Sequence, residues 1–164
     1  MTASVELSRM IALNVDDAFA LFALRLDTWW PREYTWSRDV LQAIGIQPRI
    51  GGLCYEIGPG EFHCDWGRVL AWDPPHHLTL AWQISPRREP VPDPARASRV
   101  DISFSPLDAD RTSVELTHSD FAHHGDDAEK YREAMASEQG WPYILGRFAE
   151  AASGAPKGGV ERAR

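Results

Sequence analysis

The chain has 164 residues, of which 43% are hydrophobic and 25% charged. This length suits one domain with a proper core, and this composition is that of a soluble globular protein rather than of a disordered or membrane-embedded one. The formal charge of -7 repels phosphate backbones and anionic headgroups. We therefore expect no nucleic-acid partner.

Several features of the sequence also indicate where in the cell the protein is located. Residues 1–9 lack the basic start and apolar run of a signal peptide, and no apolar stretch is long enough to span a bilayer. Cys54 and Cys64 are too few for a disulfide scaffold. The sequence predicts a cytoplasmic protein without membrane insertion.

The amino-terminal part predicts one strand and one helix. Apolar residues at odd positions over 3–13 have the period of two that is typical of a half-buried strand. Asn14 then offers a capping side chain, and apolar residues at helical spacing follow until Pro31. The pattern predicts a helix over about 15–27.

The middle of the chain predicts strands and turns. Two short apolar segments, Val40–Ile46 and Leu53–Ile57, are separated by Pro48 and a pair of glycines, and both are expected to be strands. Residues 61–82 predict a β-hairpin that turns at Pro74 and Pro75. The proline-rich stretch 85–96 is expected to be a stiff, extended loop.

The carboxy-terminal part predicts a second hairpin and a long helical region. Val100–Phe104 and Val114–His118 alternate apolar and polar residues on either side of a turn. From Asp126 to residue 152 apolar residues repeat at three- and four-residue steps, with a break expected at 137–142 because of a proline. Residues 153–164 are small, glycine-rich and charged, and we expect them to be disordered.

This order of elements predicts an α+β fold in a single domain over residues 1–152. About six to seven strands follow one another with one helix near the start, so the sheet must be antiparallel. The long helical region at the end is its expected cover.

The register of the 61–82 hairpin leaves one question open. A symmetric turn pairs Ala71 with Leu78, Val69 with Leu80 and Gly67 with Trp82, all on the inner face. Without a bulge at Gly67, Trp66, Leu70 and Trp72 then form an outer apolar patch that suggests a homodimer, while His63 and Asp65 point inward. With a bulge, Phe62, Cys64 and Trp66 join the interior and His63 and Asp65 are solvated. We favour the bulge, and in either case expect Cys54 opposite Cys64.

Four motifs carry a family resemblance: Trp66-Gly-Arg-Val-Leu-Ala-Trp-Asp-Pro-Pro75, His77-Leu-Thr-Leu-Ala-Trp82, Thr117-His-Ser-Asp-Phe121 and Gly140-Trp-Pro142. On these, residues 3–152 resemble the activator-of-heat-shock-protein-90-ATPase-like family, within the START-like or Bet v 1-like (SRPBCC) superfamily. The resemblance implies a helix-grip fold, in which a curved antiparallel sheet wraps around the carboxy-terminal helix and leaves a cavity. It also implies a chaperone contact, although the separate amino-terminal domain of the eukaryotic co-chaperones is missing.

Metal and nucleophile chemistry find little support in the sequence. His118, Asp120, His123, His124 and Asp126 have the residue types of a metal site but not a helical ligand spacing. We therefore predict no metal and no cofactor. No spacing suggests a Ser-His-Asp or Cys-His arrangement, and Cys64 lies beside an acid, Asp65, which does not favour a thiolate.

The aromatic residues exceed what a small core needs, and they either fill the core or line a pocket. His118 continues the inner face of its strand, so we expect it near the cavity rim where residues 140–141 cross; it is either a satisfied core histidine or a polar group of the cavity. We predict a non-catalytic protein that binds a small hydrophobic ligand between sheet and helix, with the 85–96 loop near the mouth. The candidate ligand-binding residues are Trp30, Tyr55, Glu56, Trp66, Trp82, Phe104, His118, Trp141 and Leu145.

Two alternatives belong to other classes. One is a co-chaperone-like domain that contacts another protein through its acidic surface. The other is a cavity enzyme of the cyclase or hydrolase type that uses His118 together with a carboxylate. The candidates for a second polar group beside His118 are Glu56, His63 and Asp65.

Overall fold

The computed structural model describes residues 3–154. Seven strands form one antiparallel sheet in the order β1-β7-β6-β5-β4-β3-β2. The strands are β1 (Val5–Ile11), β2 (Ala43–Ile46), β3 (Leu53–Ile57), β4 (His63–Asp73), β5 (His77–Trp82), β6 (Ser98–Asp108) and β7 (Arg111–Ser119). The helices are α1 (Val15–Leu24), α2 (Ala128–Ala136) and α3 (Trp141–Gly154), with short 3-10 turns η1 (Leu26–Thr28), η2 (Arg32–Tyr34), η3 (Arg38–Val40), η4 (Pro94–Arg96) and η5 (Phe121–His124).

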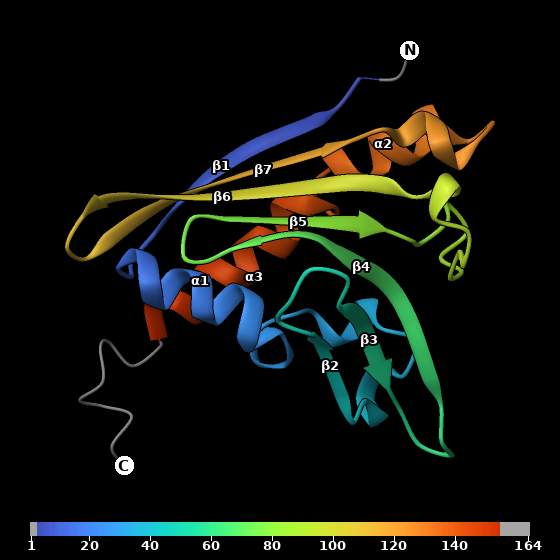
Figure 1. Ribbon diagram of the computed structural model, residues 1–164, viewed down its shortest axis with the longest axis horizontal. Coiled ribbons are helices and arrows are strands. Elements are labelled where there is room, and N and C mark those ends of the chain that lie inside the picture. The colour runs from blue at the N-terminus through green and yellow to red at the C-terminus, as the bar shows by residue number, and fades with distance from the viewer. Residues whose placement is uncertain (1–2, 155–164) are drawn as a thin grey trace.

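The sheet is curled and the carboxy-terminal helices lie across it (Figure 1). Strands β1, β7, β6 and β5 run side by side, and the long β4 bends so that β3 and β2 turn away from the rest of the sheet. Helix α3 crosses behind the central strands and α1 closes one end. This is the α+β helix-grip arrangement that the sequence predicted.

Local chemistry sets the helix boundaries. Asn14 caps α1, because its side chain accepts a hydrogen bond from the backbone N–H of Asp17 at 2.8 Å. The helix ends at Leu24, before the predicted residue 27, and a 3-10 turn continues the chain. Val40 also differs from expectation, because it ends η3 instead of beginning a strand.

The predicted break before the last helix is confirmed. A Cβ atom on Gly140 would lie 2.2 Å from the backbone oxygen of Met135, so only glycine fits where the chain leaves α2. Pro142 stands in the first turn of α3, where a missing N–H costs nothing. Ser153 and Gly154 belong to α3, and the rest of the tail expected to be disordered lies outside the described residues.

The register of β4 confirms the bulge that we favoured. Gly67 pairs with Trp82 and Cys54, whereas Asp65 pairs with Tyr55, so Trp66 is the extra residue of β4 opposite β3. Trp66 is therefore buried, with 3% of its surface exposed. Trp66 is thus lost from the outer patch on which the homodimer expectation rested, although Leu70 stays exposed.

Three finer expectations about this hairpin are wrong. A second register shift after Val69 pairs Ala71 with Thr79 rather than with Leu78. Cys64 lies opposite Glu56 and not opposite Cys54, because the turn between β3 and β4 takes up residues 58–62, so that Ile57 pairs with His63. Phe62 lies before the first residue of β4 and is 38% exposed, so it does not join the interior.

The interior has a packed end and a hollow end. At the packed end, Phe19 and Phe104 lie 5.2 Å apart between ring centroids, as do Phe22 and Phe148, in edge-to-face contacts that fill the space between α1, α3 and the sheet. The hollow end lies under the turn between α2 and α3 and holds the candidate site.

Candidate functional site

A cavity of about 290 Å³ lies between the curled half of the sheet and the α2–α3 turn. Six segments that are distant in sequence each contribute to its lining, because the curl of the sheet brings β2 to β5 around the end of α2. One lining residue from each of these segments is Trp30, Ile44, Glu56, Trp66, Trp82 and Tyr131.

Three indole rings form the floor of the cavity. Trp30 and Trp66 are stacked with 6.0 Å between centroids and 25° between planes. Trp82 meets Trp66 edge-on at 5.7 Å. Such a floor offers flat apolar surfaces in two orientations to an aromatic guest.

The β4 bulge is what brings Trp66 into this floor. Gly67, the next residue, is packed so closely that a Cβ atom there would lie 2.6 Å from the backbone oxygen of Ala81 and 3.3 Å from the side chain of Cys54. Because Gly67 has no side chain, β4 can lie this close to β3 and β5 while Trp66 points inward.

One polar chain at the floor is fully satisfied. The indole N–H of Trp82 donates to the hydroxyl of Tyr131 at 2.7 Å, and that hydroxyl donates to the backbone oxygen of Ile84 at 2.8 Å. Burial raises the pKa of Tyr131 far above its usual value. The phenol therefore stays protonated and serves as a fixed donor and acceptor.

The indole N–H of Trp66 is different. Among the described residues it is the one buried side-chain nitrogen or oxygen that has no hydrogen-bond partner. Leaving such a donor unsatisfied costs about 1–3 kcal/mol. Buried orphans of this kind are rare in folded proteins and call for an explanation.

Glu56 shapes one side of the cavity instead of standing free in it. Its carboxylate is fully buried and accepts hydrogen bonds from the backbone N–H groups of Trp36, at 3.2 Å, and Ser37, at 2.7 Å. These bonds tie residues 31–40, which we call the wall segment, to β3. The carboxylate thus holds a cavity wall in place.

The mouth of the cavity is bordered by contacts of the wall segment. The hydroxyl of Tyr34 donates to the backbone oxygen of Gln139 in the α2–α3 turn at 2.7 Å. The indole of Trp36 donates to the backbone oxygen of Arg88 at 2.9 Å, and the Arg88 guanidinium lies 5.6 Å from the centroid of the Tyr34 ring. The 85–96 loop therefore lies at the mouth, as expected.

His118 is the centre of a separate buried network. Its Nδ1 accepts from the indole N–H of Trp141 at 2.9 Å, so the neutral ring carries its proton on Nε2 and donates to Ser98 Oγ at 2.7 Å. The Ser98 hydroxyl then donates to Nε2 of His124 at 2.7 Å. Burial lowers the pKa of His118 to about 3 and that of His124 to about 4, so both rings are neutral at ordinary pH.

The predicted ligand-binding residues divide into two groups. Trp30, Glu56, Trp66 and Trp82 meet at the cavity. Tyr55, Phe104, His118, Trp141 and Leu145 do not line it. Tyr55 alternates to the outer face of β3, Phe104 belongs to the packed end, and the other three are fully or almost fully buried behind the floor.

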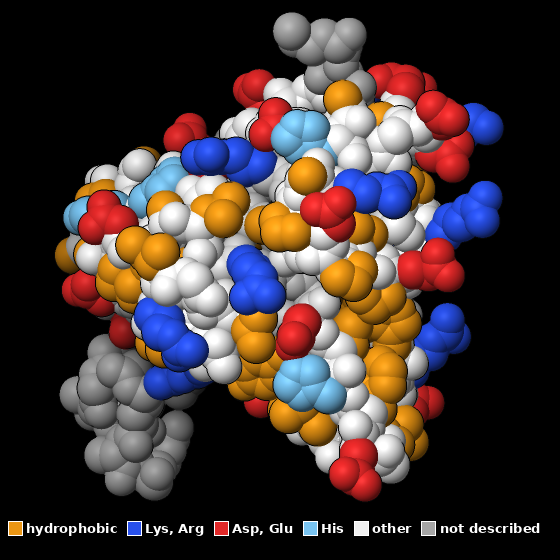
Figure 2. Space-filling view, turned by 45° about the vertical axis from the view of Figure 1, so that its right-hand side comes forward, with side chains coloured by type: hydrophobic (Ala, Val, Ile, Leu, Met, Phe, Trp, Pro, Cys, Tyr) orange, Lys and Arg blue, Asp and Glu red, His pale blue; other side chains and the backbone are white. Residues whose placement is uncertain are grey.

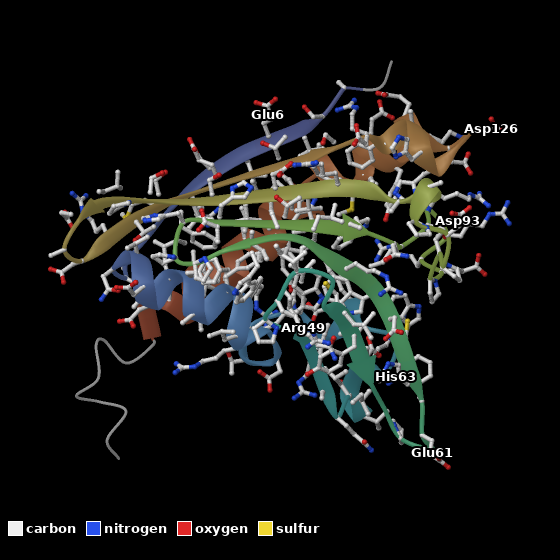
Figure 3. The ribbon with its side chains drawn as sticks, in the orientation of Figure 1. Glu6, Arg49, Glu61, His63, Asp93 and Asp126 are labelled. Atoms are coloured by element: carbon white, nitrogen blue, oxygen red, sulfur yellow. The ribbon has the colours of Figure 1, made fainter. Side chains whose placement is uncertain are left out.

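The other polar candidates lie away from the cavity. His63 and Asp65 face outward on β4, bonded to each other at 2.7 Å, and Figure 3 shows His63 near the far end of the hairpin. Burial raises the pKa of the Cys64 thiol to about 11, so it is a poor nucleophile. In residues 3–154 no three His, Cys, Asp or Glu side chains are arranged to hold a metal ion.

Sequence reasoning missed the mouth and the helix side of the site. Tyr34, Trp36, Arg88 and Tyr131 all line the cavity. The Tyr131 position carries a signal, because it lies on the apolar face predicted for the helical region. The others come from loops, whose position only the tertiary structure defines.

The fold and the cavity together define a helix-grip protein of the START-like class. The family described as activator of Hsp90 ATPase homolog 1-like protein matches residues 23–153, and the chain belongs to this family. No curated protein matches the sequence. Within the described residues, no helix is both long and apolar enough to cross a bilayer.

Solved structures share the fold along nearly the whole chain. Txn09, an anthrahydroquino-gamma-pyrone synthase complexed with SUM, is 33% identical with a TM-score of 0.65, over 90% of this chain and 95% of that chain. The self-sacrificing resistance protein CalC from Micromonospora echinospora is 24% identical, with a TM-score of 0.64 over 92% and 94%. Protein MLL2253 from Mesorhizobium loti is 18% identical, with a TM-score of 0.66 over 94% and 99%.

Proposed function

We propose that this protein binds a small, planar and mainly apolar molecule in the cavity, without transforming it. The observation that carries the proposal is the floor of three indole rings in a cavity of about 290 Å³. Small-molecule sites are concave, mostly apolar and about 300–1,000 Å³ in volume. A ligand of two or three fused rings suits this size and this floor.

The similarity to Txn09 supports the same class of ligand. That protein is a synthase of an anthrahydroquino-gamma-pyrone, which is a fused aromatic compound, and it is 33% identical to this chain. The two chains match over 90% and 95% of their lengths.

Ligand binding can be tested by placing a large side chain in the cavity from a position on α2. Ala134 lines it, whereas Ala136, on the same helix, does not. Ala134→Trp should weaken binding of the apolar probe N-phenylnaphthylamine by about tenfold or more, since the new ring occupies the ligand's space. Ala136→Trp should leave the affinity unchanged. Fluorescence titration measures both, and equal affinities in the two variants would contradict the proposal.

A second candidate is a cavity enzyme of the cyclase type, which the synthase activity of Txn09 favours. His118 does not suit the role that the sequence suggested, because both ring nitrogens already have partners and the ring does not line the cavity. Glu56 is the buried carboxylate of the lining. Consumption of a bound fused-ring ketone by the wild type but not by Glu56→Gln would favour this candidate.

Three sequence-based expectations stay predictions: a cytoplasmic location, a homodimer and a chaperone contact. The face of Figure 2 mixes acidic and basic side chains rather than gathering one sign of charge. Sedimentation tests the dimer, and stimulation of a chaperone ATPase by the purified chain tests the contact.

A further inference from the structure

We propose that the ligand of this cavity carries a carbonyl oxygen in the plane of its rings, and that this oxygen accepts a hydrogen bond from the indole N–H of Trp66. The inference rests on the proposed function and names the chemistry of the ligand more closely. Aryl ketones and quinones are the corresponding class of molecule.

The unsatisfied donor is the starting point. The indoles of Trp29, Trp82 and Trp141 are buried like that of Trp66, and each donates to a protein acceptor: Leu21 O, Tyr131 Oη and His118 Nδ1 respectively. Trp66 has no such acceptor and lines the cavity. The protein therefore satisfies the buried indoles of Trp29, Trp82 and Trp141 internally and leaves that of Trp66, a residue of the cavity lining, unpaired.

No neighbouring polar group accepts this hydrogen bond. The Glu56 carboxylate is turned to two backbone N–H groups, and the Tyr131 hydroxyl accepts from Trp82 and donates to Ile84. The missing acceptor is then a group on a molecule in the cavity. Because an indole N–H only donates, the matching group on the ligand is an acceptor.

The surroundings favour a neutral acceptor. Glu56 is a buried carboxylate of the lining, and the carboxylate of Glu33 lies at the mouth, where Tyr143 and Arg147 contact it. Arg38 and Arg88 are the basic residues of the lining, and both are exposed. An anionic group deep in the cavity would meet Glu56 without a buried cation beside it, whereas a carbonyl oxygen meets no such repulsion.

A matched ligand pair tests the inference. Fluorenone and fluorene have the same three fused rings and differ by a carbonyl in place of a methylene group. Equilibrium dialysis gives the Kd of each for the wild type and for Trp66→Phe, which keeps an aromatic ring and removes the N–H. We expect the preference for fluorenone over fluorene to fall about three- to tenfold in the variant, because one neutral hydrogen bond is lost.

Controls distinguish a failure of the carbonyl inference from a failure of the proposed ligand binding. Trp72→Phe changes an indole that does not line the cavity, and should leave both affinities unchanged. If both ligands bind and Trp66→Phe does not alter the preference, the carbonyl inference is wrong and ligand binding stands. If the wild type binds neither ligand, the proposed function fails and the inference fails with it.

A measurement on the wild type covers the case in which Trp66→Phe does not fold. In the ¹⁵N-labelled protein, the assigned indole N–H resonance of Trp66 should move downfield on addition of fluorenone and move less on addition of fluorene. Equal shifts with the two ligands would overturn the inference.

Discussion

Gly67 shows how one residue positions a ligand-binding side chain. Its Cα lies so close to β5 that a methyl group would meet the Ala81 oxygen at 2.6 Å, and backbone atoms cannot move aside as a flexible side chain can. The bulge beside it turns Trp66 inward. The consequence of replacing Gly67 is therefore both a loss of stability and a shift of the cavity floor.

We predict that Gly67→Ala lowers the free energy of unfolding by about 1–3 kcal/mol, as overpacking of a tight site does. The control is Gly146→Ala in the middle of α3, where a Cβ atom would meet only an Arg9 nitrogen, at 3.6 Å. There the helix propensity of alanine should stabilise the protein by about 0.5–1 kcal/mol. Urea unfolding measures both, and a neutral Gly67→Ala would contradict the account of the bulge.

At the scale of elements, the wall segment joins three parts of the molecule that are far apart in sequence. It is bonded to β3 through Glu56, to the 85–96 loop through Trp36 and to the α2–α3 turn through Tyr34. Of the side chains that make these three contacts, only that of Glu56 is fully buried. This carboxylate is therefore the anchor of the segment.

We predict that Glu56→Ala destabilises the fold by about 1–3 kcal/mol for each backbone N–H that loses its acceptor. The amides of Trp36 and Ser37 should also exchange hydrogen faster, since they lose their protection. Glu115→Ala, at an exposed position on β7, is the matched control and should change neither quantity. Unchanged exchange at the two amides of Glu56→Ala would show that the anchor is unimportant.

At the scale of the whole molecule, the buried histidines make stability depend on pH. His118 and His124 have folded pKa values of about 3 and about 4, below the value of about 6.5 in an unfolded chain, because burial disfavours the charged ring. The unfolded state then binds more protons between these limits, so stability is full above about pH 6.5 and falls as pH falls.

We predict that His118 contributes about 2 kcal/mol to the loss of stability between about pH 7.5 and about pH 5, and that His124, which is less deeply buried, contributes less. His118→Gln should be less stable than the wild type at the higher pH, through lost hydrogen bonds, and should show a smaller difference between the two pH values. His76→Gln changes an exposed ring and should leave the difference unchanged. Urea unfolding at both pH values measures the effect; an undiminished difference in His118→Gln would contradict it.

The α+β order of strands and helices was largely readable from the sequence because its signals are local, whereas the helix-grip arrangement was implied by the family resemblance. Alternation of apolar residues marks strands. Asn14 marks a helix end through its side chain, and Gly140 and Pro142 do so through their backbone chemistry. The facing of Leu78, Leu80 and Trp82 also followed from a period of two, and all three are buried.

The candidate site was only partly readable. The sequence singled out Trp30, Glu56, Trp66 and Trp82, which line the cavity, because they are aromatic or charged residues on predicted inner positions. It also placed Phe104 and His118 at the ligand, although one fills the packed end and the other is bonded within the core. Strand periodicity predicts which side chains face inward. Which of these border the cavity depends on how much of the space beside the sheet α1, α2 and α3 occupy.

By itself, then, the sequence determined the order of strands and helices, the break before the last helix and the hydrophobic inner face of the sheet, since all of these depend on neighbours within a few residues. Only the tertiary structure decided that β4 bulges at Trp66, that Cys64 faces Glu56, and that the loops carrying Tyr34 and Arg88 meet at the mouth of the cavity. Those outcomes depend on how closely separate strands approach and on which space the helices leave unfilled, and no local pattern encodes either.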